Sequence, residues 1–446
     1  MNNSVDIETR RPMKTRFCTF YERAQLLIGL SVPIVIGIYT FVQYNNEQAI
    51  AEKNRQQDLA ILNETRIKDL ELAADVRAHD LSMADDQQKE DLLIKYQYFV
   101  ANLLTNTGKL SDKNSHAVYF KTLVTLSRLN AARKISLIQS LYSINLIQRH
   151  GESPVIPLAS ADLANINFSV VTEFPCIAFE GALLNNASFR HANIDRASFK
   201  KAKLSHADFS YTISPNKQRN CNDNDHEDGI VFREAYMYRT KFINTSYISA
   251  YFGQFAMANE ANFYGFKCVS CDFSDVSLIR ANFTEASIQA GKLDSTTFSR
   301  ANMTEACLHK SYFQTVELSD TIMTNVNGTE AEFNKCVFSG AYLVNSSFNQ
   351  VKIIQSSMLK VNLTDTDLSK SNLTKVIFIS ADLHYVNMQH VYAYKCNFTQ
   401  ADFTNADLTN GIFIENDFSN AILTHQQLAS AKSLQGSILP NGTVAV

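Results

Sequence analysis

The chain has 446 residues, of which 45% are hydrophobic and 19% are charged, with a formal net charge of −3. One domain typically has about 100–200 residues, so this length predicts two or more structural units. The hydrophobic content excludes a disordered chain, and the nearly neutral net charge excludes wholesale nucleic-acid binding. The 8 Cys are too few for a disulfide scaffold, while the lack of Trp beside 29 Phe indicates selection against the largest side chain.

Residues 1–23 form a basic tail, and residues 24–44 predict a membrane span. The segment from Ala24 to Tyr44 carries no charge, and as a helix it covers roughly 30 Å, the thickness of the hydrocarbon core. The alternatives are a buried soluble helix or a signal peptide, but a signal peptide has a shorter apolar core and a small-residue cleavage site after it. We therefore expect a single transmembrane helix with the lipid bilayer as its partner.

Basic residues are distributed unevenly on the two sides of this span. Five precede it and two follow within the next twenty residues, namely Arg10, Arg11, Lys14, Arg16 and Arg23 against Lys53 and Arg55. The positive-inside rule then predicts a single-pass protein with a cytoplasmic N-terminus and an extracellular or luminal C-terminal region.

Residues 45–104 contain neither Gly nor Pro, and an Asp-Leu pair recurs every eleven residues from Asp58 to Leu92. Eleven residues make three helical turns, so each pair returns to nearly the same helix face. This pattern predicts a long polar helix, either a solvated single helix or, as we favour, a coiled coil through which the chain forms a homo-oligomer. The expected seam consists of Leu59, Leu62, Leu70, Ala73 and Leu81.

Residues 105–150 predict a small helical module. Gly108 ends the long helix, and Asn130 is expected to be the N-cap between two amphipathic helices. Gly151 and Pro154 end helical structure after it. The module is interpreted as a connector or cap rather than a functional site.

Residues 158–435 repeat with a period of five, with an insertion at 211–229 and a C-terminal tail at 436–446. Every fifth residue from Phe263 to Leu423 gives thirty-three positions, of which thirty are Leu, Phe, Met or Ile; the exceptions are Cys268, Gly328 and Ala393. A small residue usually stands two positions earlier. Since a period of five fits neither a helix nor a flat strand, the pattern predicts a solenoid of stacked coils.

Tandem motifs such as Ala381-Asp382-Leu383 and Ala406-Asp407-Leu408 resemble the pentapeptide-repeat family over more than half of the chain. The resemblance implies a right-handed quadrilateral β-helix with four pentapeptides per coil, whose central large residue and preceding small residue point inward. A tube this narrow excludes indole, which explains the absent Trp. The residues expected in the core of the repeats are Phe189, Leu204, Phe283, Phe298, Leu308, Phe338, Leu363, Phe378, Leu383, Phe398, Phe403, Leu408 and Phe418.

The expected fold is therefore mixed: an N-terminal transmembrane helix and α-helical stalk, then the β-helix. At four repeats per coil, one ladder along a single face is expected to hold Phe298, Phe338, Phe378, Phe398 and Phe418. The layout of one span, a Gln/Asp/Arg-rich helix and a repeat tail also resembles membrane proteins that carry pentapeptide repeats, and that resemblance implies no biochemical activity.

The cysteines and the insertion are the candidate chemical sites of the sequence. Cys268 and Cys271 form a lone CxxC on inward repeat positions, so we interpret them as packing residues rather than as part of a zinc site. Cys176 and Cys221 fall off those positions and can pair if the region is luminal. The acidic insertion, which includes Asp223 and Asp228, is interpreted as a solvated loop rather than a Ca²⁺ site.

The sequence contains no catalytic, cofactor-binding or metal-binding constellation, so we expect no enzyme activity. The predicted function is a membrane-anchored structural scaffold that binds an unknown protein partner. The alternative is a regulatory module that inhibits a partner by shape or charge mimicry. Some members of the family that the repeats resemble imitate DNA, which requires a strongly acidic rod. Residues 158–446 have 27 acidic and 22 basic side chains, a difference of only −5, so no nucleic-acid mimicry or binding is expected.

Overall fold

The structure is a computed structural model that describes residues 14–107, 112–148, 154–170, 173–215 and 229–446. It describes the backbone alone for residues 14–33, 106–107, 112–114 and 170. The chain divides into two compact units, Met1–Asp86 and Gln87–Val446.

The first unit contains the N-terminal part of helix α1 (Lys14–Thr107), which includes the helix predicted over residues 45–104. Pairs four residues apart support the helix, such as Lys68 Nζ and Glu64 Oε1 at 2.7 Å. The leucines of the predicted seam, Leu59, Leu62, Leu70 and Leu81, are 51–72% exposed. The helix is therefore present, and its pairing with a second helix stays a prediction.

The predicted span at residues 24–44 lies within α1. Among the residues whose side chains are described, none of the helices is both long enough and apolar enough to cross a bilayer. Residues 24–33, the first half of the predicted span, have no described side chains.

Two further helices, α2 (Asp112–Arg128) and α3 (Ala131–Ser143), follow in the second unit. The predicted N-cap is confirmed, since Asn130 Oδ1 accepts a hydrogen bond from the backbone N–H of Arg133 at 3.1 Å. The last turns of α1 pack against both helices: Tyr96 and Thr122 share a buried hydroxyl hydrogen bond of 2.5 Å.

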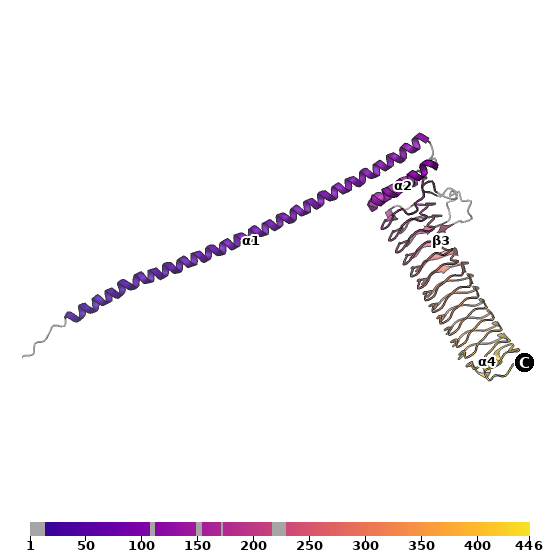
Figure 1. The fold of residues 1–446 in the computed structure, drawn as a ribbon. Coiled ribbons are helices and arrows are strands. Elements are labelled where there is room, and N and C mark those ends of the chain that lie inside the picture. The colour runs from indigo at the N-terminus through magenta and orange to yellow at the C-terminus, as the bar shows by residue number, and fades with distance from the viewer. Residues whose placement is uncertain (1–13, 108–111, 149–153, 171–172, 216–228) are drawn as a thin grey trace, which may run out of the picture. The chain divides into compact units, whose positions relative to one another are not determined.

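These helices close the N-terminal end of a β-solenoid (Figure 1). The Tyr119 hydroxyl of α2 donates to the carbonyl of Ala159 at 3.0 Å, and the Tyr142 hydroxyl of α3 donates to the carbonyl of Pro175 at 2.7 Å. Their apolar side chains continue directly into the solenoid core. A solenoid needs such an end cap, because its first coil otherwise exposes its core and unpaired backbone.

The solenoid consists of short parallel strands in one twelve-stranded sheet. In chain order they are β1 (Ile213–Ser214), β2 (Ile230–Val231), β3 (Ser246–Tyr251), β4 (Lys267–Asp272), β5 (Ser287–Ile288), β6 (Lys292–Asp294), β7 (Tyr312–Gln314), β8 (Glu332–Asn334), β9 (Lys352–Ile354), β10 (Asn372–Thr374), β11 (Tyr392–Tyr394) and β12 (Ile412–Ile414). Leu373 in β10 lies opposite Ile353 in β9 and Ala393 in β11. These coils therefore advance by twenty residues, which is four pentapeptides, whereas β3 and β4 are offset by 21 residues, as Ser246 lies opposite Lys267.

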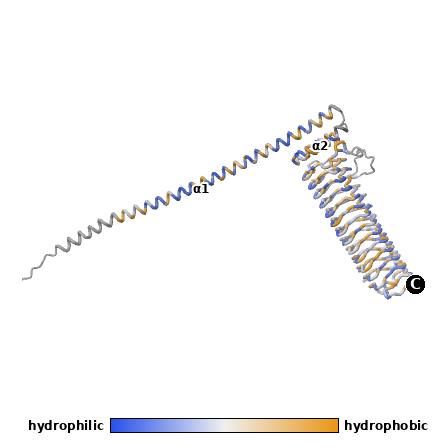
Figure 2. Tube along the Cα trace, viewed as in Figure 1, coloured by the Kyte–Doolittle hydropathy of each residue, from blue (hydrophilic) through white to orange (hydrophobic). Residues whose placement is uncertain are grey.

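Each coil turns at four corners, and a typical corner has a residue in the left-handed region. Consecutive examples are Asp320, Asn325, Glu330 and Lys335, with φ between 55° and 60°. The small inward residue after a corner donates its N–H to the carbonyl of the large inward residue before it, as in Ala281 N to Leu278 O at 3.0 Å. Hydrophilic and hydrophobic residues consequently alternate around every coil (Figure 2).

All thirteen residues expected in the core of the repeats lie inside the solenoid, and none is more than 2% exposed. The predicted ladder of five phenylalanines is only partly present. Phe398 stacks on Phe378 and Phe418, with ring centroids 4.9 and 5.0 Å apart. Leu318 and Met358 occupy the same position in the intervening coils, so Phe298 and Phe338 do not join this stack.

The insertion lengthens one coil. Ser198 bridges to Val231, thirty-three residues away instead of twenty, so the solenoid continues on both sides of the extra segment. Before the insertion β1 pairs with β3, and after it β2 also pairs with β3, so both ends of the insertion belong to the solenoid. Residues 216–228 lie outside the described residues, and so do the acidic loop and Cys221 that the sequence singled out.

The C-terminal end differs from the predicted boundary at residue 435. Helix α4 (His425–Ser430) replaces one side of the last coil, and Thr424 caps it through a capping box with Gln427. The ladder then resumes, since Ile412 bridges to Ser433 and Asp417 to Ile438. Residues 436–446, expected to be a tail, thus begin within the final coil.

Candidate interaction surface

One corner is straightened in each of two successive coils of the solenoid, the coils that contain β3 and β4. Ser249 and Ser270 stand at corner positions but lack the positive φ of the other corners. Strands β3 and β4 therefore run for six residues across two sides of the coil, where the later strands have two or three. A Cβ at Gly229 would lie 2.4 Å from the carbonyl oxygen of Ser249. Only glycine fits this approach.

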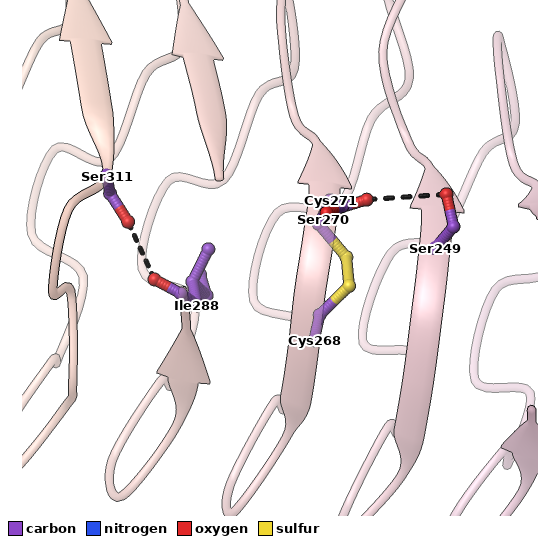
Figure 3. The surroundings of a disulfide bond; sticks show 6 residues. All are labelled: Ser249, Cys268, Ser270, Cys271, Ile288 and Ser311. Carbon is purple, nitrogen blue, oxygen red and sulfur yellow. Dashed lines mark hydrogen bonds between the residues drawn. A yellow bond between two sulfur atoms is a disulfide. The ribbon is translucent and has the colours of Figure 1, made fainter. Parts of the chain in front are cut away.

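A disulfide bond joins Cys268 and Cys271 across the straightened corner of β4, with Cα atoms 5.9 Å apart (Figure 3). Cys268 is the large inward residue before the corner, and Cys271 is the small inward residue after it. At ordinary corners the backbones of these two positions are joined by a hydrogen bond, as in Ala281 N to Leu278 O. The prediction that both thiols only fill space was wrong. Two inward positions that flank one corner lie within the Cα separation that a disulfide requires, and the CxxC spacing was the available signal.

Loss of this disulfide is expected to lower the free energy of unfolding by about 2 kcal/mol, since it closes a short loop in the unfolded chain. The variant Cys268→Leu/Cys271→Ala restores an ordinary large and small pair. Urea unfolding is measured for both proteins with and without dithiothreitol. The destabilisation by dithiothreitol should be larger in the wild type by this amount, and the remaining effect in the variant reports the disulfide at Cys176. Equal effects in both proteins would contradict the assignment.

The remaining cysteines differ in their bonding. Cys176 is disulfide-bonded, but the predicted pairing with Cys221 involves a residue outside the described part and stays a prediction. Cys336 and Cys396 are free and buried, and burial raises the pKa of each thiol to about 12. Such thiols stay protonated, which makes them inert packing residues.

The straightened corner exposes apolar side chains. Ile248 in β3 and Val269 in β4 lie side by side on adjacent coils, 48% and 55% exposed. We call the surface formed by Ile248, Ser249, Val269 and Ser270 the flat corner. Ser249 Oγ reaches the carbonyl of Ser270 at 3.5 Å (Figure 3). At the corner that follows β3, Phe255 is 76% exposed.

Opposite charges are paired from coil to coil on the remaining surface. Glu260 contacts Arg239 at 2.8 Å and Arg280 at 3.9 Å, and Lys395 contacts Glu415 at 3.4 Å. The hydrogen bond from Arg239 lowers the pKa of Glu260. Exposed pairs of this kind contribute little stability, and each of them neutralises the surface locally.

Within the described residues, no group of three or more His, Cys, Asp or Glu side chains is arranged to hold a metal ion. The solenoid interior is filled: the space lined by Phe283, Leu293 and Phe313 has an accessible volume of about 0 Å³. What the described part of the solenoid offers to other molecules is therefore its outer surface and its C-terminal end.

The pentapeptide-repeat profile matches eight copies along the chain, within residues 177–210, 259–289, 281–320, 311–350, 356–392 and 396–431. No curated protein matches the chain significantly.

Three solved structures illustrate the likeness. HetL, a pentapeptide repeat protein involved in heterocyst differentiation regulation in the cyanobacterium Nostoc sp. strain PCC 7120, is 20% identical, with 70% of this chain and 98% of that chain covered and a TM-score of 0.24. A pentapeptide repeat protein of the Arabidopsis thaliana thylakoid lumen is 19% identical, with 28% and 86% covered and a TM-score of 0.22. Full-length QnrB1, a plasmid-mediated fluoroquinolone resistance protein, is 11% identical, with 53% and 94% covered and a TM-score of 0.20.

Proposed function

We propose that the repeat region of this chain belongs to the pentapeptide-repeat family, whose profile matches it in eight copies. On this basis the protein is a membrane-anchored, non-catalytic scaffold whose β-solenoid binds other proteins. The observation that carries the proposal is the packed interior: apolar side chains fill the core in the described coils, and the space lined by Phe283, Leu293 and Phe313 has a volume of about 0 Å³. A rigid, repetitive outer surface is suited to protein contacts instead.

The flat corner is our choice for a contact surface on the solenoid. Single exposed apolar residues are ordinary, but Ile248 and Val269 are neighbours on adjacent coils, and Phe255 is exposed on the next corner. The disulfide between Cys268 and Cys271 holds the backbone beneath them. A rigid apolar contact loses little conformational entropy on binding, which favours a partner there.

The membrane anchor is supported by the uncharged segment at residues 24–44 and by the basic residues before it. The disulfides support the proposed orientation, because such bonds persist in extracellular, luminal and periplasmic compartments and are rare in the cytosol. The solenoid is therefore proposed to be extracellular or luminal, with the N-terminus in the cytoplasm.

The full chain is expected to stay in the membrane pellet after extraction with alkaline carbonate, and deletion of residues 24–44 is expected to release it. As a matched control, deletion of residues 59–80 removes two eleven-residue repeats and should leave the chain in the pellet. In sealed vesicles with the cytosolic side outward, protease should spare the solenoid until detergent is added. Complete extraction of the full chain by carbonate would contradict the anchor.

Self-association through α1 is proposed as the second role of this helix. Apolar side chains in the part of α1 before its last turns, including Leu59, Leu70 and Leu81, are exposed and have no partner among the described residues. Arg66 and Arg77 precede Leu70 and Leu81 by four residues, so basic side chains adjoin the seam. A seam bordered in this way specifies register through charge pairs as well as apolar contacts.

A further inference from the structure

The C-terminal end of the solenoid has one side that lacks a following strand. On two other sides the next coil continues, since Phe413 N donates to Ser433 O and Phe418 N to Ile438 O, both at 2.8 Å. On the side formed by residues 403–410, helix α4 occupies the place of that strand. The backbone of this side therefore faces α4 instead of another coil.

Two backbone donors are left open by this replacement. One coil earlier, Tyr385 N donates to Thr404 O at 3.0 Å and Met388 N to Asp407 O at 2.8 Å. The equivalent donors in the last coil are the N–H groups of Asn405 and Leu408. Neither of them has an acceptor among the described residues.

The acceptors on the same side are already satisfied. Gln427 of α4 donates through Nε2 to the carbonyls of Phe403 and Ala406, at 2.6 and 2.9 Å. The side chain thus imitates the N–H of the missing strand. Helix α4 also supplies one acceptor, since the carbonyl of Ser430 accepts a hydrogen bond from Asn410 N at 3.0 Å. The groups left open on this side are therefore the two N–H donors, and a ligand that pairs with them needs to supply acceptors.

A pocket of about 570 Å³ lies between α4 and this side of the coil. That volume is in the range of about 300–1,000 Å³ found for ligand sites. Its polar side chains are mostly neutral, including Thr404, Thr409, Thr424, Gln426 and Ser430. The exception is Asp407, whose pKa is lowered by hydrogen bonds from Thr409, so its carboxylate stays charged and disfavours an anionic ligand.

We propose that this pocket binds an extended, uncharged peptide segment of a partner protein, whose backbone carbonyls accept hydrogen bonds from the N–H groups of Asn405 and Leu408. The segment lies in the space between α4 and this side of the coil and pairs with the coil through these two N–H groups, a limited form of the strand addition called β-augmentation. Hydroxyl and amide groups around it favour small polar side chains. The inference rests on the proposed function, that the solenoid binds proteins, and adds a site and a ligand class.

The test uses the full-length protein and hydrogen exchange of individual amides. The probe is an acetylated and amidated peptide of two uncharged repeats, Ala-Asn-Leu-Thr-Asn-Ala-Asn-Leu-Thr-Asn. At millimolar concentration it is expected to slow exchange of the Asn405 and Leu408 amides about tenfold. The same peptide with its carbonyls reduced to methylenes should have no effect. Gln426→Trp, which fills the pocket, should abolish protection, whereas Gln426→Ala should retain it.

Unchanged exchange at both amides would overturn the proposal, and so would equal protection by the reduced peptide. Protection by acetate alone would show a carboxylate site and overturn the uncharged ligand class. Slower exchange in β3 and β4 instead of residues 404–409 would overturn this pocket while leaving the proposed function intact, because the solenoid would then bind peptide at the flat corner.

Discussion

Phe398→Ala is expected to lower the free energy of unfolding by about 3–5 kcal/mol. The ring of Phe398 stacks on Phe378 and Phe418 at 4.9 and 5.0 Å and meets Phe403 edge to face at 5.3 Å. All four side chains are fully buried. Truncation therefore leaves a cavity between coils whose backbone spacing is fixed by the ladder, so the space cannot close. Urea unfolding followed by circular dichroism measures the change.

Phe255→Ala is the matched control, because it makes the same substitution on a side chain that is 76% exposed. Its effect should be within about 0.5 kcal/mol, as for surface substitutions that remove no packing. A loss for Phe398→Ala no larger than for Phe255→Ala would contradict the assignment of Phe398 to the core.

Gly328→Leu is expected to destabilise the protein by about 3 kcal/mol, although it restores the residue type of the repeat. Gly328 stands at a large inward position, but a Cβ there would lie 2.2 Å from Cε1 of Phe348 and 2.4 Å from its Cδ1. Phe348, at the same position one coil later, already fills the space over Gly328. The added side chain must displace that ring.

Phe348→Ala in the Gly328→Leu background provides the compensating test. Alone, Phe348→Ala opens a cavity, but the new leucine fills it, so the double variant should be about 2 kcal/mol more stable than the sum of the single effects. Additive effects would mean that the two residues do not share the space. Urea unfolding of the four proteins in parallel gives the coupling energy directly.

The repeat architecture could be predicted because each pentapeptide contains the same pattern of large and small residues. A large residue at every fifth position and a small one two residues before it specify inward packing at every side of the coil, independent of distant contacts. The exception at Gly328 was visible in the sequence, but its reason was not. It depends on the ring of Phe348, twenty residues away in the chain and adjacent only after the coils stack.

The flat corner and its disulfide were not predicted, because the sequence keeps its period through them. Ser249 and Ser270 are ordinary corner residues by type, and only the backbone reveals that they lack the left-handed turn. Cys268 and Cys271 were correctly assigned to inward positions. The CxxC spacing was a signal for the disulfide between them, whereas the repeat pattern contains no signal for the straightened corner.

The C-terminal boundary was missed for a different reason. The capping box of Thr424 and Gln427 is a local helix signal, but it lies directly after an unbroken run of repeats. The four residues from Thr424 to Gln427 favour a helix, whereas the five-residue repeat before them favours another side of the coil. After α4 the bridged residues are Ser433 and Ile438, which pair with Ile412 and Asp417. Each lies 21 residues after its partner instead of twenty, so the frame of the repeat shifts by one residue and the sequence pattern does not extend into this coil.

Site-specific photo-cross-linking in the full-length protein tests most directly whether the solenoid is the protein-binding part. A photoreactive residue is placed at Val269 on the flat corner or at Leu70 on α1, two exposed positions. We predict adducts with other proteins from Val269 and adducts between two copies of the chain from Leu70. Adducts with other proteins from Leu70 alone, with none from Val269 or other solenoid positions, would contradict the account.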